Sequence, residues 1–245
     1  MNNNYKLIIS YNGSKYAGWQ QQKNAITVQE KLINTIEILL KEKVNLIGAG
    51  RTDTGVNALG QVANFRTDIK IEDLDKFCYS LNSLLPNDIS IKKIECVNKD
   101  FHSRFDAKSR SYLYLFLTEK DPFYHNFAFY YPKIAEYSIN KLNEISKQML
   151  GRFDFTSFSK RNTDTNHNFC TVTNVCWRKA GNKYIFLIEA DRYLHGMVRT
   201  TIGTILRCIN NNEENGLINV IKLKNRIFAG ESVPAKGLFL YKIKY

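Results

Sequence analysis

Long hydrophobic runs are absent from this 245-residue sequence. The longest apolar stretches, such as residues 112–117, are far shorter than the roughly 20 residues that a membrane-spanning helix needs. The apolar run that follows residues 1–4 is also shorter than the apolar region of a signal peptide. We therefore expect no membrane segment and a cytoplasmic location.

Cysteine is scarce, and histidine more so, with five and four residues respectively. The cysteines are scattered and odd in number, which favours free thiols in a reducing compartment over a disulfide framework. His167, Cys170 and Cys176 lie close in sequence, but their spacing fits no paired-cysteine zinc motif and a fourth ligand is missing. We therefore expect no metal site.

Acidic residues are outnumbered, with 23 Asp and Glu against 35 Lys and Arg, which leaves a net charge of +12. Such a surplus favours a polyanionic partner, most simply a nucleic acid. The alternative explanation of the positive charge is that all proteins of the source organism are rich in lysine, in which case the charge indicates no particular partner. Hydrophobic residues at 44% and charged residues at 24% are typical of a globular chain, long enough for one large or two small domains.

A glycine-rich stretch at residues 47–65 holds one guanidinium, Arg51, and one carboxylate, Asp53. Glycine permits positive φ angles and close approach of a ligand to the backbone. A charged pair in a glycine-rich turn between two apolar runs is typical of a site on a loop held by a scaffold. The alternative is a surface turn in which Asp53 bonds its own backbone.

Two hydrolytic chemistries find little support. The triplet Asp53-Thr54-Gly55 also occurs in aspartic proteases, but that fold needs strongly apolar residues before the triplet, and here Gly-Arg-Thr precedes it. His195 is a candidate general base, but it has no Ser or Cys partner in a recognisable motif. We therefore reject the protease, and a nucleophilic triad has little support.

Residues 50–62 read Gly-Arg-Thr-Asp-x-Gly-Val-x-Ala-x-Gly-Gln-Val, which resembles the central motif of the TruA family of tRNA pseudouridine synthases. About ten identities make a chance match far less frequent than for a three-residue motif. The resemblance implies that Asp53 is the catalytic residue. Asn57 departs from the pattern, because the family usually has His at that position.

Further matches extend the resemblance from residue 11 to residue 240. They cover residues 11–22, 101–114, 151–158, 191–203 and 232–240, with Phe153 in place of a second family His and Val233 in place of Ala. The resemblance implies that Tyr112 stacks on the target uracil and that Arg199 is the basic residue near Asp53. The alternative for Tyr112 is a core position, since the alternation at residues 112, 114 and 116 indicates a strand without revealing its exposed face.

The implied reaction is isomerisation of uridine to pseudouridine in the anticodon arm of tRNA, at about positions 38 to 40, after the base is flipped out of its stack. No cofactor is implied. Arg51 would fill the vacated space or hold a phosphate, and Arg199 would keep Asp53 ionised. Attack by Asp53 on C1′ and assistance of glycal formation both remain open. The alternatives are a paralogue that modifies ribosomal RNA and a non-catalytic RNA-binding module.

The fold class predicted is α+β. Hydrophobic periodicity indicates a strand at residues 5–11, a helix at 27–40, a helix at 71–85 and a strand at 89–97, with two strand-like segments around the glycine-rich loop. That order is typical of a ferredoxin-like unit. The resemblance implies two such halves, residues 1–106 and 107–245, joined through an extended mixed or antiparallel sheet with a central cleft.

The second half is predicted to hold a helix that begins after Ser138, a hairpin at residues 171–190 and a basic helix at 217–228, with a loop at 160–168. The resemblance also implies a homodimer, because the family binds tRNA across two subunits. The aromatic-rich segment at residues 122–132 is a candidate dimer surface, stacking surface or packed loop.

Overall fold

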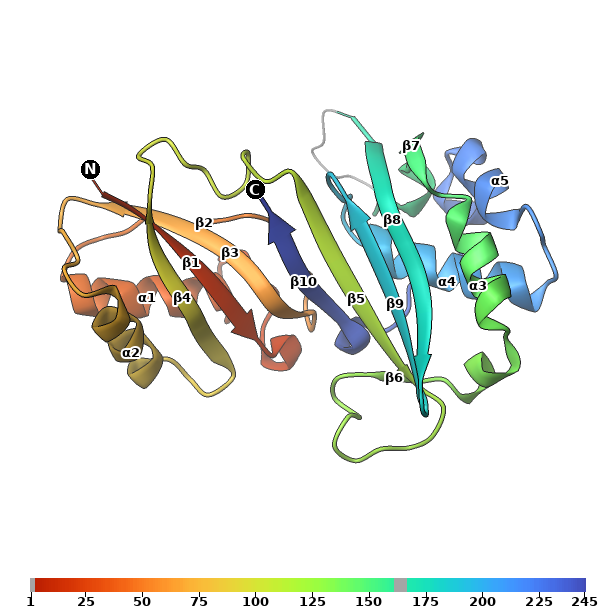
Figure 1. Cartoon of the computed structure of the whole chain (residues 1–245), viewed down its shortest axis with the longest axis horizontal. Helices are drawn as coiled ribbons and strands as arrows, with labels where there is room; N and C mark the ends of the chain where they lie inside the picture. The colour runs from red at the N-terminus through yellow and green to blue at the C-terminus, as the bar shows by residue number, and fades with distance from the viewer. Residues whose placement is uncertain (1–2, 161–166) are drawn as a thin grey trace. The chain divides into compact units, whose positions relative to one another are not determined.

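The computed structural model describes residues 3–160 and 167–245, and its packing divides the chain into two compact units (Figure 1). Unit 1 comprises Met1–Lys108 with Phe239–Tyr245, and unit 2 comprises Ser109–Leu238. The division predicted at residues 106 and 107 stays a prediction. By packing, the last seven residues group with the first unit and not with the segment that precedes them.

Unit 1 has the predicted order of strands and helices. Its elements are β1 (Asn3–Tyr11), α1 (Val28–Leu40), β2 (Ile47–Gly48), β3 (Asn57–Thr67), α2 (Leu74–Leu84), β4 (Ile89–Val97) and β10 (Leu238–Lys244), with a short 3-10 segment, η1 (Gly13–Lys15). The strands pair in the order β4-β1-β3-β10. β1 is antiparallel to both neighbours, whereas β10 runs parallel to β3, so the sheet of this unit is mixed.

Local signals explain where the two helices of unit 1 begin. Thr27 caps α1, because its side chain accepts the backbone N–H of Glu30 at 3.3 Å. α2 begins at Leu74, three residues later than predicted, because Asp73 caps it by accepting the N–H of Lys76 at 2.8 Å. The prediction that this helix starts at residue 71 is therefore wrong at its boundary.

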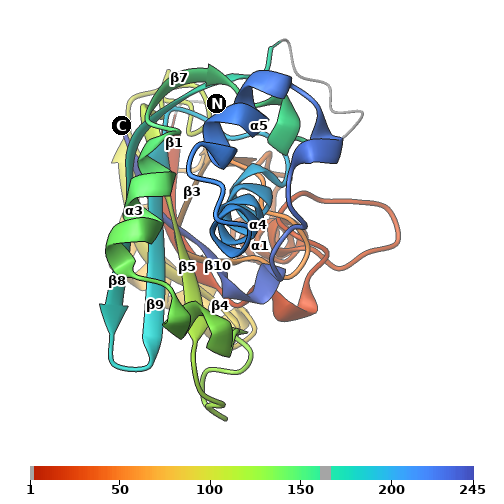
Figure 2. The same ribbon diagram turned by 90° about the vertical axis from the view of Figure 1, so that its right-hand side faces the viewer.

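Unit 2 contains the remaining elements. They are β5 (Ser109–Leu117), β6 (Phe129–Tyr130), η2 (Pro132–Glu136), α3 (Ile139–Lys147), β7 (Gly151–Asp154), η3 (Thr156–Phe158), β8 (Phe169–Ala180), β9 (Lys183–Ala190), α4 (Met197–Asn210), α5 (Gly216–Leu223), η4 (Arg226–Phe228) and η5 (Ala235–Gly237). The strands pair antiparallel in the order β5-β9-β8-β7, and β6 adds a short parallel pairing to β5. Figure 2 shows α4 and α5 to one side of these strands.

A buried aromatic group anchors the core of unit 2. The ring of Trp177 lies 4.9 Å from that of Phe186 and 5.6 Å from that of Phe116, centroid to centroid. Its indole N–H donates to the hydroxyl of Ser146 on α3 at 2.8 Å, so its polar atom is satisfied where water is excluded. This packing holds α3 against β8.

The structure confirms the predicted hairpin and corrects the last helix. β8 and β9 are joined across Gly181 and Asn182. α5 ends at Leu223 because Lys224 adopts a left-handed conformation, with φ of 49°, and Asn225 then caps the separate turn η4. Of the loop predicted at 160–168, residues 161–166 lie outside the described residues.

The chain is therefore α+β, with a mixed sheet in each unit. No helix in the described part of the chain is long and apolar enough to cross a membrane. The ferredoxin-like character of the halves and a cleft between them stay predictions.

Candidate functional site

The loop at residues 49–56 connects β2 to β3 and carries Arg51 and Asp53. Its start is held to β3, because the N–H of Ala49 donates to the carbonyl of Val62 at 2.8 Å. The buried side-chain amide of Gln61 donates to the carbonyl of Gly50 at 2.9 Å. Asp53 is half-buried and Arg51 is exposed, so the loop presents both charged groups from a fixed base.

A second segment, residues 11–20, supports this loop. The hydroxyls of Tyr11 and Thr52 share a buried hydrogen bond of 2.8 Å, one residue before Asp53. The backbone N–H of Trp19 donates to the carbonyl of Thr52 at 3.1 Å. The N–H of Gly55 donates to the carbonyl of Tyr16 at 3.4 Å. The residues on both sides of Asp53 are therefore tied to the same segment.

Two glycines allow this close approach. A Cβ atom on Gly13 would stand 2.0 Å from the carbonyl oxygen of Val56, and one on Gly18 would stand 2.5 Å from that of Thr52. Gly18 also has a φ of +91°, which L-residues rarely adopt. Any larger residue at either position would push the segment away from the loop.

The side chain of Asn57, the first residue of β3, also stabilises the contact between residues 11–20 and the loop of Asp53. Asn57 is buried, and its amide oxygen accepts the backbone N–H of Gly13 at 2.9 Å. In the sequence, Asn57 is visible only as a departure from the family pattern. Nothing in residues 11–22 identifies this supporting role except the two glycines and Trp19, which indicate that another part of the chain packs closely here.

Tyr16 anchors the supporting segment to the start of β4. Its hydroxyl donates to the carboxylate of Asp88 at 2.5 Å, and the N–H of Asn12 donates to the carbonyl of Asp88 at 2.9 Å. Burial, with a smaller contribution from the Asp88 carboxylate, raises the pKa of Tyr16 well above its usual value. Tyr16 therefore stays protonated and acts as a donor, not as a base.

Arg51 points along the same segment. Its Nε–H donates to the side-chain oxygen of Gln20 at 3.0 Å in an exposed position. This bond orients the guanidinium of Arg51, an exposed residue, along the supporting segment.

In unit 2, Tyr112 lies on β5 on the same face as Tyr114 and Phe116, because alternate residues of a strand point to one side. Tyr112 is 9% exposed, and its ring meets that of Tyr193 edge-on, with centroids 5.0 Å apart and an interplanar angle of 84°. The hydroxyl of Tyr193 donates to the carbonyl of Arg110 at 3.3 Å. Tyr112 is thus mostly buried, and its ring packs at nearly a right angle against that of Tyr193.

Arg199 lies in the first turn of α4 and is tied to the segment before β10. Its Nε–H donates to the carbonyl of Val233 at 2.7 Å, and the N–H of Val233 donates to the carbonyl of Arg199 at 3.3 Å. The hydroxyl of Tyr114 donates to the carbonyl of Pro234 at 2.8 Å. Burial raises the pKa of Tyr114 well above its usual value, and the positive charge of Arg199 opposes that shift.

The predicted site residues therefore fall into two pairs. Arg51 and Asp53 share one loop of unit 1, and Tyr112 and Arg199 belong to unit 2. Their assembly around one substrate stays a prediction. Within residues 3–160 and 167–245, no group of three or more His, Cys, Asp or Glu side chains is arranged to hold a metal ion.

Comparison with known proteins gives consistent matches over almost the whole chain. A family model described as tRNA pseudouridine synthase matches residues 7–106 and 145–245. The tRNA pseudouridine synthase A of Parabacteroides distasonis is 40% identical over 242 residues, which cover 98% of this chain and 95% of that protein. The protein of the same name from Acetivibrio thermocellus is 38% identical over 243 residues, covering 99% of each chain.

Among solved structures, "Crystal Structure of a Cbf5-Nop10-Gar1 Complex" matches 81% of this chain and 43% of its own, with 11% identity. The TM-score of 0.35 is too low for any argument to rest on this similarity.

Replacement of Gly18 by alanine should separate steric overlap from backbone strain. Gly18→Ala places a Cβ 2.5 Å from a backbone oxygen at a φ of +91°, whereas Gly181→Ala meets nothing within 4 Å at a φ of +59°. We expect Gly181→Ala to lower the free energy of unfolding by about 1 kcal/mol. Gly18→Ala should cost at least about 1 kcal/mol more, because the loop must move as well. Denaturant unfolding measures both, and equal losses would contradict the close contact.

Proposed function

This chain belongs to the family of tRNA pseudouridine synthases, and we propose that its targets are uridines of the tRNA anticodon arm, at about positions 38 to 40. As a member of that family it is an isomerase that converts uridine in tRNA to pseudouridine. The observation that carries the proposal is the family match, because the first of its two matched ranges, residues 7–106, includes the glycine-rich loop with Asp53.

The reaction breaks the C1′–N1 bond of uridine, turns the detached uracil and joins its C5 to C1′. No group is imported and no net oxidation occurs. The step requires a carboxylate at the sugar or base and a pocket that retains the uracil. In our proposal Asp53 is that carboxylate, supported by its half-buried position on a loop that is hydrogen-bonded on both sides.

The other proposed site residues bind the substrate. Tyr112 stacks on the flipped uracil, since an aromatic face accepts any base. Arg51 holds a phosphate or fills the space that the base vacates, in line with its exposed guanidinium beside Gln20. Arg199 keeps Asp53 ionised, because a nearby cation favours the charged form of a carboxyl group.

The proposed assembly is a cytoplasmic homodimer with tRNA as its partner. The net charge of +12 supports binding to a polyanion. The exposed ring of Phe123, in the segment between β5 and β6, supports an aromatic contact surface there. The two units are proposed to be ferredoxin-like halves of one extended sheet, with the substrate in the cleft between them.

The substrate is tested with purified protein and an unmodified tRNA transcript. We expect pseudouridine at the anticodon arm without any added cofactor, because the isomerisation consumes nothing. Ribosomal RNA serves as the rival substrate in a parallel reaction, and the modified positions are mapped in both. Activity on ribosomal RNA alone would refute the tRNA assignment and leave the chemistry intact.

Asp53→Asn should reduce turnover strongly while leaving folding and RNA binding intact. The substitution keeps the size of the side chain and removes its charge, which is worth about 4 kcal/mol, or roughly a thousandfold in rate. Asp53→Glu keeps the charge but displaces it by about 1 Å, which costs roughly a hundredfold. Single-turnover rates, tRNA affinity and a melting curve are measured together for each variant.

The matched control is Asp100→Asn, which neutralises an exposed carboxylate in the turn after β4. This variant should convert uridine at the parental rate. If Asp53→Asn folds, binds tRNA and still reacts at a rate comparable to the parent, Asp53 is not the catalytic residue.

Tyr112 should matter for turnover more than for RNA affinity. Tyr112→Leu removes the stacking face, and we expect the single-turnover rate to fall by about tenfold or more. Tyr112→Phe keeps the ring and loses only the hydroxyl, so comparing its rate with that of Tyr112→Leu separates stacking from the contribution of the hydroxyl. Affinity for tRNA should change little in either variant, because binding comes mainly from dispersed phosphate contacts. A parental rate for Tyr112→Leu would show that stacking is not its role.

A further inference from the structure

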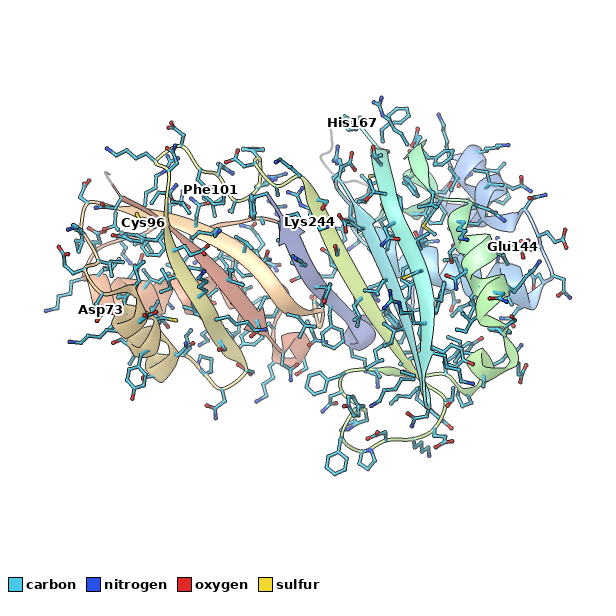
Figure 3. The ribbon with its side chains drawn as sticks, viewed as in Figure 1. Asp73, Cys96, Phe101, Glu144, His167 and Lys244 are labelled. Atoms are coloured by element: carbon cyan, nitrogen blue, oxygen red, sulfur yellow. The ribbon has the colours of Figure 1, made fainter. Side chains whose placement is uncertain are left out.

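Basic and aromatic side chains gather around one exposed ring where β8 begins. Phe169, the first residue of β8, is 41% exposed. The guanidinium carbon of Arg152 on β7 lies 5.2 Å from the centroid of the Phe169 ring. The ring of His167, labelled in Figure 3, lies 6.3 Å from it. We call the set of Arg152, His167, Phe169 and Arg192 the Phe169 cluster.

Arg192 joins the cluster from the segment after β9. Its Nη1 lies 3.2 Å and 3.3 Å from the two ring nitrogens of His167. Its backbone N–H donates to the carboxylate of Asp191 at 2.7 Å, and the same oxygen accepts the N–H of Thr171 on β8 at 2.8 Å. Arg192 is therefore anchored to the strand that carries Phe169.

The carboxylates that adjoin the cluster in sequence make other contacts. One oxygen of Asp191 accepts those two backbone N–H groups. Asp154 accepts the hydroxyl and the N–H of Thr156 and forms an ion pair with Lys224 at 3.2 Å. Arg152 is exposed over the Phe169 ring, and Arg192 is half-buried beside the ring of His167, so each arginine adds a guanidinium group next to an aromatic ring of the cluster.

A phenyl ring that contacts one guanidinium, with a second guanidinium on the neighbouring His167 ring, matches the chemistry of an unpaired nucleotide. The base stacks on an aromatic face, and arginine binds the phosphate through charge-assisted hydrogen bonds. The position also suits the substrate proposed above, because Arg192 is followed directly by Tyr193, whose ring contacts Tyr112 at 5.0 Å. The residue next to Arg192 in the chain therefore contacts the ring on which the target base is proposed to lie.

We propose that the Phe169 cluster binds an unpaired nucleotide that neighbours the target uridine in the substrate RNA. The base lies on the Phe169 ring, and the phosphate is held by Arg192 and Arg152. His167 orients the Arg192 guanidinium. This inference rests on the proposed function, and it adds a second contact for RNA beyond the four residues of the catalytic site.

The test measures affinity for an unmodified tRNA transcript over a range of salt concentrations. Phe169→Leu should weaken binding about tenfold with the salt dependence unchanged, because it removes stacking and no charge. Arg192→Gln should also weaken binding, and it should reduce the slope of log affinity against log salt by about one, as expected for one lost phosphate contact.

Two matched controls separate these effects from general changes in shape or charge. Phe169→Tyr keeps the aromatic face and should bind within about twofold of the parent. Arg178→Gln removes an exposed arginine from the other end of the same strand and should likewise change affinity by less than about twofold. A melting curve for each variant confirms that it is folded.

The proposal is overturned if folded Phe169→Leu binds tRNA as tightly as the parent. It is also overturned if Arg178→Gln loses as much affinity and salt dependence as Arg192→Gln, because the effect would then be one of net charge. Pseudouridine formation by the parent protein is measured in the same preparation. A parent that is inactive on tRNA contradicts the proposed function, whereas an active parent with unaffected cluster variants contradicts the cluster alone.

Discussion

The contact between two loops of unit 1 is the constraint on which the candidate catalytic residue depends. The Tyr11 and Thr52 hydroxyls meet inside the protein, and the backbones around Gly13 and Gly18 approach the loop of Asp53 more closely than any side chain would permit. The hydrogen bond itself contributes about 1 kcal/mol to stability. Its larger effect is on position, since a displacement near 1 Å costs roughly a hundredfold in rate.

Much of the fold could be predicted because its signals are local. Thr27 and Glu30 lie within one helical turn, and the alternation that marks residues 89–97 is complete within the strand itself. The loop that carries Asp53 was equally visible, because glycines and charges between two apolar runs stand next to one another in sequence. Two predicted helix boundaries were wrong because a capping residue, and not the apolar pattern, sets the helix end. Asp73 caps the start of α2, and the left-handed Lys224 ends α5.

Contacts between distant residues could not be predicted. Asn57 accepts a hydrogen bond from Gly13, 44 residues away, and no periodicity reports such a bond. The same limit applied to Tyr112, because an alternating strand has two faces and the pattern does not say which neighbour covers either one. Tyr193, which contacts its ring, lies 81 residues further along the chain, as the numbers 112 and 193 show. The roles of Asp53, Tyr112, Arg51 and Arg199 stay predictions.

The parallel pairing of β10 with β3 has a consequence for biosynthesis. β10 pairs with Asn57 and Ala58, the residues that begin β3 directly after the loop of Asp53. A ribosome makes the part of β10 that belongs to unit 1, from Phe239 on, only after the whole of unit 2 has been translated. The sheet beside the loop of Asp53 therefore stays incomplete on the nascent chain, and a product whose translation stops early in β10 carries Asp53 without the strand that borders its loop.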